Sequence, residues 1–258
     1  MVAQLLDGVR FFGRGLKIYG RSPRLVVLGI IPALLTLVLF AVLFGVLLYF
    51  VDDLSRLVTW FADDWSSGSR TAIRLAAGVG LVGLALLLWA ISFTAVTLLI
   101  GDPFYEKIAE AVEESLGGVP GAIDLKWHQE LGRSIRDSLR LLLLSAVIGI
   151  PLFILGFIPI IGQTVVPVLG VLVGGWFLAV ELVGVAFARR GLRMSDRVRV
   201  LSARRWTAVG FGACVFLTFL IPLGAVFVMP AAVAGGTLLA RESLELDAAR
   251  PSVVAQPG

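Results

Sequence analysis

The 258-residue sequence has only one cysteine, Cys214, and one histidine, His128. A single cysteine excludes an intrachain disulfide, and one histidine with one cysteine cannot make a His/Cys zinc site. The chain also lacks the G-x-x-x-x-G-K-S/T sequence of the common ATP-hydrolysing loop. We therefore expect no metal, no cofactor and no enzymatic activity, and we expect no nucleic-acid partner.

Charge is the second thing the sequence has little of. Charged residues make up 16% of the chain and hydrophobic residues 58%, against about 25% and about 45–50% in a soluble domain. Residues 141–188 carry one charge, Glu181, and residues 206–240 carry none. Stretches of this kind occupy lipid. The composition predicts an all-α integral membrane protein with a lipid-bilayer partner and small polar segments.

Two uncharged runs are long enough to cross the membrane alone. Residues 25–51 and 75–101 contain no charge, and each would be about 40 Å long as a helix, more than the hydrocarbon core of about 30 Å. The first run is also longer than the apolar part of a signal peptide, which has roughly 7–15 residues. We expect both to be full transmembrane helices.

Two further apolar blocks are interrupted by proline and glycine. IPIIGQ stands at 158–163 and IPLG at 221–224, and in both blocks a second proline follows eight residues after the first. Residues 206–240 are too many for one span and too few for two spans with a turn, since one span takes about 20 residues. We expect re-entrant, half-penetrating hairpins at 139–188 and 206–240. Ordinary full spans are the alternative.

The charges outside these blocks orient the chain. Residues 1–24 hold five basic groups and one acid, residues 189–205 hold seven and one, and residues 52–74 hold four acids against three arginines. The positive-inside rule places the N-terminus in the cytoplasm. An amphipathic cytoplasmic helix is expected over 104–116, with Asp102 as its cap and Pro103 in its first turn. The membrane domain would cover 1–242, and 243–258 would be a disordered tail.

A candidate anion site stands where the first span begins, in the sequence GRSPRL at 20–25. Ser22 is a good helix cap and Pro23 a good first-turn residue. The free backbone N–H groups of such a turn, with Arg21 and Arg24 beside them and Leu25 completing the turn, suit a tetrahedral oxyanion. Ordinary capping with positive-inside arginines is the alternative interpretation.

Several polar residues are candidates for a solute path. Glu106, Glu110 and Glu113 recur on one helix face, where they would line a cytoplasmic vestibule, pair with arginines at 133–140, or remain solvated. Glu181 is the only acid inside an apolar block, which indicates either a functional group or a structural ion pair. Gln163 stands at one hairpin bend and would face a pore or form a polar turn.

Three segments, in order along the chain, resemble the CysZ sulfate permease family, which is grouped with the eukaryotic etoposide-induced membrane proteins. The first is DPF at 102–104 with IAEAVE at 108–113. The second is FIPIIG at 157–162 with WFL at 176–178 and Glu181, and the third is MPAAVAG at 229–235. The resemblance extends over roughly residues 10–241.

The resemblance implies a bacterial inner-membrane oligomer, with two spanning helices and two half-penetrating hairpins, that admits sulfate for cysteine synthesis. It also implies a sulfate site at a Gly-Leu-Arg-Arg element, which aligns with residues 23–27, where valines replace the paired arginines. We thus expect a homo-oligomeric sulfate permease or channel; a non-transporting scaffold or a transporter of another solute is the alternative. The predicted substrate-binding residues are Arg21, Ser22, Arg24 and Leu25. The predicted pore or gate residues are Phe104, Glu106, Glu110, Gln163 and Glu181.

Overall fold

The structure, a computed structural model, describes residues 1–119, 127–221 and 223–249, and within these ranges the side chains of 127–138 are not described. Over these ranges the chain forms helices and no strand, so the predicted all-α class is confirmed. Four of the described helices, α2, α3, α5 and α9, are long and apolar enough to cross a membrane. The elements are α1 (Val2–Arg21), α2 (Pro23–Val58), η1 (Trp60–Ala62), α3 (Ser67–Ser115), α4 (Trp127–Leu155), α5 (Ile161–Leu182), α6 (Gly184–Ala188), α7 (Met194–Ser202), α8 (Arg205–Phe219) and α9 (Gly224–Ala248).

The chain divides into two compact units, and the smaller one covers Ile30–Pro103. It consists of most of α2 and most of α3, joined through η1. Aromatic rings pack between the two helices, with the Phe40 and Trp89 centroids 5.7 Å apart. The predicted spans 25–51 and 75–101 lie inside α2 and α3, and most of their large apolar side chains are exposed, as lipid-facing side chains are.

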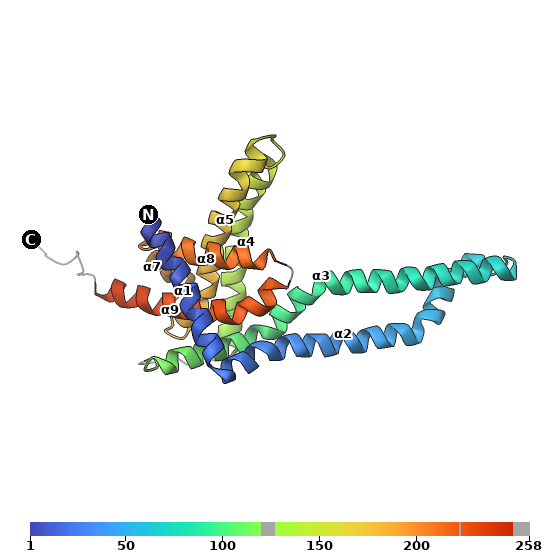
Figure 1. The fold of residues 1–258 in the computed structure, drawn as a ribbon, viewed down its shortest axis with the longest axis horizontal. Coiled ribbons are helices and arrows are strands. Elements are labelled where there is room, and N and C mark those ends of the chain that lie inside the picture. The colour runs from blue at the N-terminus through green and yellow to red at the C-terminus, as the bar shows by residue number, and fades with distance from the viewer. Residues whose placement is uncertain (120–126, 222, 250–258) are drawn as a thin grey trace, which may run out of the picture. The chain divides into compact units, whose positions relative to one another are not determined.

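The larger unit joins Met1–Gly29 to Phe104–Gly258, and its interior is built on close helix contacts. Figure 1 shows α1 lying against α8 and α9. A side-chain carbon at Gly8 would collide with the carbonyl oxygen of Thr207, and one at Gly15 with that of Ala231. Small residues therefore allow the backbones of these helices to approach closely.

Glycines also allow close approach of the backbones of α5 and α8. A side-chain carbon at Gly212 would collide with the Gly175 carbonyl, and Gly174 and Gly175 meet Phe216 and Ala213. Gly174 and Gly175 thus serve helix packing. Gly170 has open space around it instead.

Two helical hairpins, α4–α5 and α8–α9, turn in the same way. Each second helix is preceded by an apolar residue with positive φ, Ile160 at 71° and Leu223 at 61°. The following glycines, Gly162 and Gly224, each lie against a carbonyl oxygen six residues earlier in the chain. Any side chain there would meet backbone atoms, so glycine is required at both turns.

The structure corrects the prediction for residues 102–116. They are helical and amphipathic, with Tyr105, Ile108 and Val112 buried, but no new helix begins at Pro103. Instead α3 continues through Pro103 to Ser115. The helix ends at Ser115, one residue from the expected 116, and Gly117 and Gly118 follow it with φ of 98° and 76°.

The two ends of the chain also differ from the sequence expectation. Residues 1–24 were expected only as a basic cytoplasmic segment, but most of them form the separate helix α1. At the other end, α9 continues to Ala248, past residue 242, where the expected disordered tail would start. Residues 250–258 lie outside the described part of the chain.

Candidate functional site

The predicted anion site lies at the junction of α1 and α2, inside the larger unit. Ser22 has an extended backbone (φ −104°, ψ 106°) that separates the two helices. The Val26 N–H donates to the Ser22 carbonyl oxygen at 3.1 Å and makes the first hydrogen bond of α2. The N–H groups of Arg24 and Leu25 precede this bond, so they have no acceptor within the helix. Donors of this kind at a helix N-terminus are the groups that anions bind.

The polar side chains of this turn reach solvent, whereas its apolar side chain is buried. Arg21 and Arg24 are exposed, Ser22 is half-buried and Leu25 is buried. In the described part of the chain neither arginine has an ion-pair partner, and the Ser22 hydroxyl makes no hydrogen bond. The four predicted residues therefore lie in one turn, and the side chains of Arg21, Ser22 and Arg24 have no polar partner among the described residues.

Tyr19 of α1 contacts the first turns of α2. Its hydroxyl donates to the Val26 carbonyl oxygen at 3.4 Å, and it lies with Pro230 of α9 against Gly29. Burial raises the pKa of the Tyr19 hydroxyl above its ordinary value of 10.0, so the hydroxyl stays neutral even well above physiological pH. The start of α2 is thus held against both α1 and α9.

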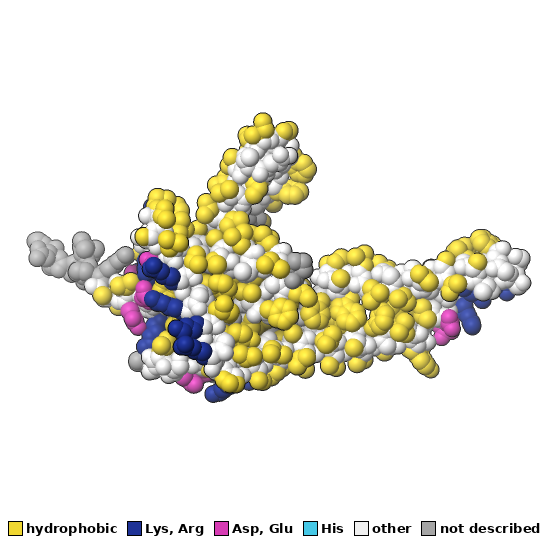
Figure 2. Space-filling model, in the orientation of Figure 1, with side chains coloured by type: hydrophobic (Ala, Val, Ile, Leu, Met, Phe, Trp, Pro, Cys, Tyr) yellow, Lys and Arg dark blue, Asp and Glu magenta, His cyan; other side chains and the backbone are white. Residues whose placement is uncertain are grey.

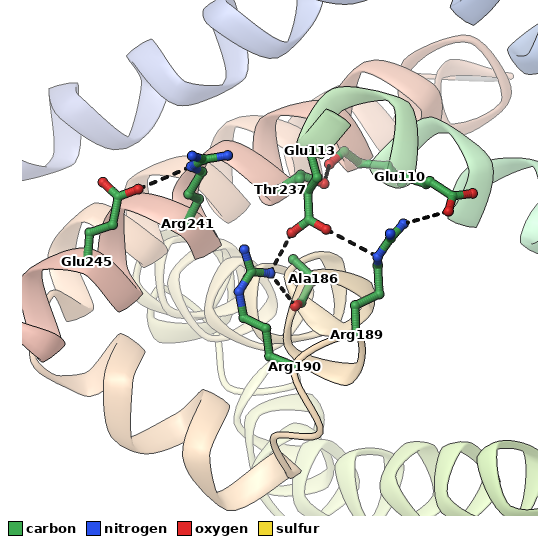
Figure 3. Close-up of polar contacts among 9 residues, drawn as sticks. Glu110, Glu113, Ala186, Arg189, Arg190, Thr237, Arg241 and Glu245 are labelled. Atoms are coloured by element: carbon green, nitrogen blue, oxygen red, sulfur yellow. Dashed lines mark hydrogen bonds and ion pairs between the residues drawn. The ribbon is translucent and has the colours of Figure 1, made fainter. Parts of the chain in front are cut away.

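A cluster of four charges forms a second polar centre (Figure 3). Glu110 and Glu113 come from the last two turns of α3, and Arg189 and Arg190 follow directly after α6. Arg189 Nη1 lies 3.2 Å from Glu110 Oε1, and Arg189 Nε lies 3.3 Å from Glu113 Oε2. Arg190 Nη1 donates to Glu113 Oε1 and to the Ala186 carbonyl oxygen.

Burial differs sharply between the two acids of this cluster. The Glu113 side chain is fully buried, whereas that of Glu110 is about half exposed. Two guanidinium groups neutralise the two carboxylates, which is the condition under which a charge is tolerated away from water. One arginine, Arg189, bridges the buried acid and the exposed acid.

The sequence analysis missed the partners in this cluster. It gave arginines at 133–140 as one alternative for the acids of α3, but the described ion pairs are made by Arg189 and Arg190, which it counted only as part of a basic segment. Arg140 is exposed, and the side chains of Arg133 and Arg136 lie outside the described residues. No local spacing signal connects Glu113 with Arg190, because 77 residues separate them.

Glu181 lies beside an open, mostly apolar groove of about 590 Å³ between α4, α5 and α8. Leu141 and Ser145 line it from α4, Phe177 from α5 and Phe216 from α8. The Glu181 side chain is exposed and has an interaction partner of its own. This acid therefore faces a hollow between hairpin arms rather than a packed core.

The remaining candidates are spread along the larger unit. Gln163 is exposed in the first turn of α5, about 27 Å along that helix from Glu181, so these two cannot act at one point. Phe104 is half-buried, and Glu106 is exposed and has a partner. Both share the end of α3 with Glu110. Over the described ranges no group of acids, histidine and cysteine could hold a metal ion.

Comparison with known proteins identifies a matching family. The sequence profile of the family described as "Sulfate transporter CysZ/Etoposide-induced protein 2.4" matches residues 11–230. A protein named sulfate transporter CysZ from Pseudomonas aeruginosa is 30% identical over 236 residues, which cover 90% of this chain and 94% of the relative. Its namesake from Pseudomonas syringae is 30% identical over 246 residues, covering 92% of this chain and 93% of the relative.

Proposed function

The chain belongs to the sulfate transporter CysZ/etoposide-induced protein 2.4 family, and from this membership we propose that it carries sulfate inward across a bacterial inner membrane. The names of relatives that match more than nine-tenths of their own length support this substrate. The four long apolar helices support a membrane location. The chain acts as a transporter and not as an enzyme, and it uses no ATP hydrolysis of its own.

Sulfate would bind at the α1–α2 junction. The observation that carries this assignment is the turn in which two exposed arginines, Arg21 and Arg24, stand beside two N–H groups without helical acceptors. A doubly charged tetrahedral anion needs several donors and positive charge at once, and the N-terminus of α2 with its arginines provides both. The free Ser22 hydroxyl adds another donor.

Calorimetric titration of the purified protein with sulfate tests this site. Each charge-assisted hydrogen bond contributes about 1.5–3 kcal/mol, so Arg21→Ala/Arg24→Ala should weaken sulfate binding by roughly 100-fold or more. The matched control, Arg10→Ala/Lys17→Ala, removes the same charge from α1 without touching the turn and should bind almost normally. Unchanged binding in the first variant would discard the site.

The charge cluster at the end of α3 is proposed as the gate. The Glu110–Arg189 pair is partly exposed and therefore weak enough to open, whereas Glu113 anchors both arginines from the buried side. Phe104 and Glu106 precede the pair on α3 and would line the approach. We expect Glu110→Gln to change the rate of sulfate flux while calorimetric affinity stays the same; an unaltered rate would remove Glu110 from the gate.

The hairpins are proposed to enter the bilayer from the cytoplasmic side and to return to that side. Gln163 lies at the bend of the α4–α5 hairpin, and Glu181 lines the groove between α4, α5 and α8. The α8 arm has 15 residues, about 22 Å as a helix, which is shorter than the hydrocarbon core of about 30 Å. A cysteine at Leu220, in a Cys214→Ser background, should resist an impermeant thiol reagent added outside the cell. Labelling from outside would mean a complete crossing.

The N-terminus is proposed to be cytoplasmic, because 1–24 and 189–205 carry the basic excess. A homo-oligomer is also proposed, as the resemblance to the family implies; the apolar surface exposed on α4 and α5 is open to contact with lipid or with a second copy (Figure 2). Chemical crosslinking in native membranes would give a ladder of multiples of the 27.6 kDa chain; a single band at every crosslinker concentration would argue for a monomer.

A further inference from the structure

Helix α1 has three distinct faces, and in the described part of the chain one of them is buried. Gly8, Phe11 and Gly15 form the buried face, which packs on α8 and α9. A helix turns 100° per residue, so the positions between these residues point elsewhere. The two other faces are exposed, and they differ in chemistry.

The first exposed face is apolar. Val2, Leu6, Val9 and Leu16 repeat at helical spacing, and each is between 42% and 70% exposed. Gly13 lies on the same stripe with open space around it. A row of large apolar side chains along a whole helix has no reason to face water.

The second exposed face is basic and lies directly beside the apolar one. Arg10, Arg14, Lys17 and Arg21 are spaced by four, three and four residues, and all are exposed. Figure 2 shows Lys and Arg side chains gathered in the region where Figure 1 draws α1. Asp7 on α1 and Glu242 on α9 offset part of this charge, so the face stays positive.

The position of α1 next to α2 indicates which partner its exposed faces contact. Only Ser22 separates α1 from α2, the first candidate span, so the C-terminal end of α1 lies at the membrane surface. An apolar stripe flanked by basic side chains is the pattern of a helix lying in the bilayer interface. We propose that α1 binds anionic phospholipids, with the apolar stripe among the acyl chains and the basic stripe on the headgroup phosphates.

Depth along α1 can be measured with nitroxide labels on the full chain in liposomes containing phosphatidylglycerol, in a Cys214→Ala background. Labels at Val9 and Arg10 lie on the two different exposed faces. We expect the label at 9 to collide more with oxygen, which dissolves in lipid, and the label at 10 more with a water-soluble nickel chelate. Equal nickel access would place the stripe in water, and shielding of the label at 9 from both reagents would mean that a second copy covers it; either overturns the proposal.

Headgroup selectivity can be read from a fluorophore at Gly13, quenched by brominated phosphatidylglycerol or by brominated phosphatidylcholine. The anionic lipid should be enriched beside the label. Each basic side chain near an anionic surface contributes about fivefold, so Arg10→Gln/Lys17→Gln should lose roughly 25-fold of this preference. The charge-keeping control Arg10→Lys/Lys17→Arg should retain it. Equal quenching by both lipids in the unaltered chain would refute anionic-lipid binding.

Discussion

Replacing Glu113 by glutamine removes one charge from the centre of the ion cluster and keeps the size of the side chain. The carboxylate is 0% exposed, and its partners Arg189 and Arg190 are 26% and 20% exposed. Removing one partner of a buried ion pair costs about 3–5 kcal/mol. Because both guanidinium groups reach some water, we reduce the expected loss to about 2–3 kcal/mol.

Glu110→Gln is the matched control for this variant. It makes the same chemical change one helical turn away, on a side chain that is 48% exposed, where a pair contributes about 0–1 kcal/mol. The same cluster and the same two arginines are present in both variants. The comparison therefore isolates burial as the cause of any difference in stability.

Thermal unfolding of the purified protein in detergent measures the difference. A change of 1 kcal/mol shifts the midpoint by roughly 2–4 °C in a chain of this size, so we expect a drop of about 4–12 °C for Glu113→Gln and less than about 4 °C for Glu110→Gln. The double variant Glu113→Gln/Arg190→Met should recover part of the loss, since it leaves one fewer unpaired charge. Equal midpoints for the two single variants would refute the burial argument.

Two further predictions concern close helix contacts, each with a control at a glycine that has open space around it. Gly212→Ala places a carbon against the α5 backbone and should cost about 1–3 kcal/mol, lowering the unfolding midpoint, whereas Gly170→Ala should leave it unchanged or slightly raised. Gly224→Ala meets the Thr218 carbonyl oxygen at the hairpin turn and should lower the midpoint by a similar amount, with Gly149→Ala as its control. A midpoint for either test variant equal to that of its control would mean that the contact relaxes at no cost.

The features predicted correctly from the sequence depend on composition and on prolines and glycines that end helices. The uncharged runs at 25–51 and 75–101 identified the helices α2 and α3, and the proline and glycine motifs at 158–163 and 221–224 identified both hairpin turns. The expected end of the amphipathic helix at residue 116 lies one residue from the end of α3 at Ser115. These signals are strong because each depends on lipid solubility or on backbone conformation within a few residues.

The features that could not be predicted from the sequence depend on contacts between segments that are far apart in the chain. Pro103 indicated a helix start, but α3 continues through it, and the buried residues that follow it belong to the larger unit. The partners of Glu113 come from a different segment, and ion pairs between segments leave no periodic signal. Helix α1 was missed because its buried face consists mainly of glycines, which carry little hydrophobic weight, although the spacing of Gly8, Phe11 and Gly15 is helical.

Uptake of radiolabelled sulfate into liposomes that contain only the purified protein tests the transport function most directly. We expect uptake that follows the sulfate gradient without ATP, that exceeds the uptake by protein-free liposomes, and that falls sharply in Arg21→Ala/Arg24→Ala but not in Arg10→Ala/Lys17→Ala. A non-transporting scaffold would give no uptake above protein-free liposomes. That result, obtained with folded and correctly inserted protein, would contradict the account.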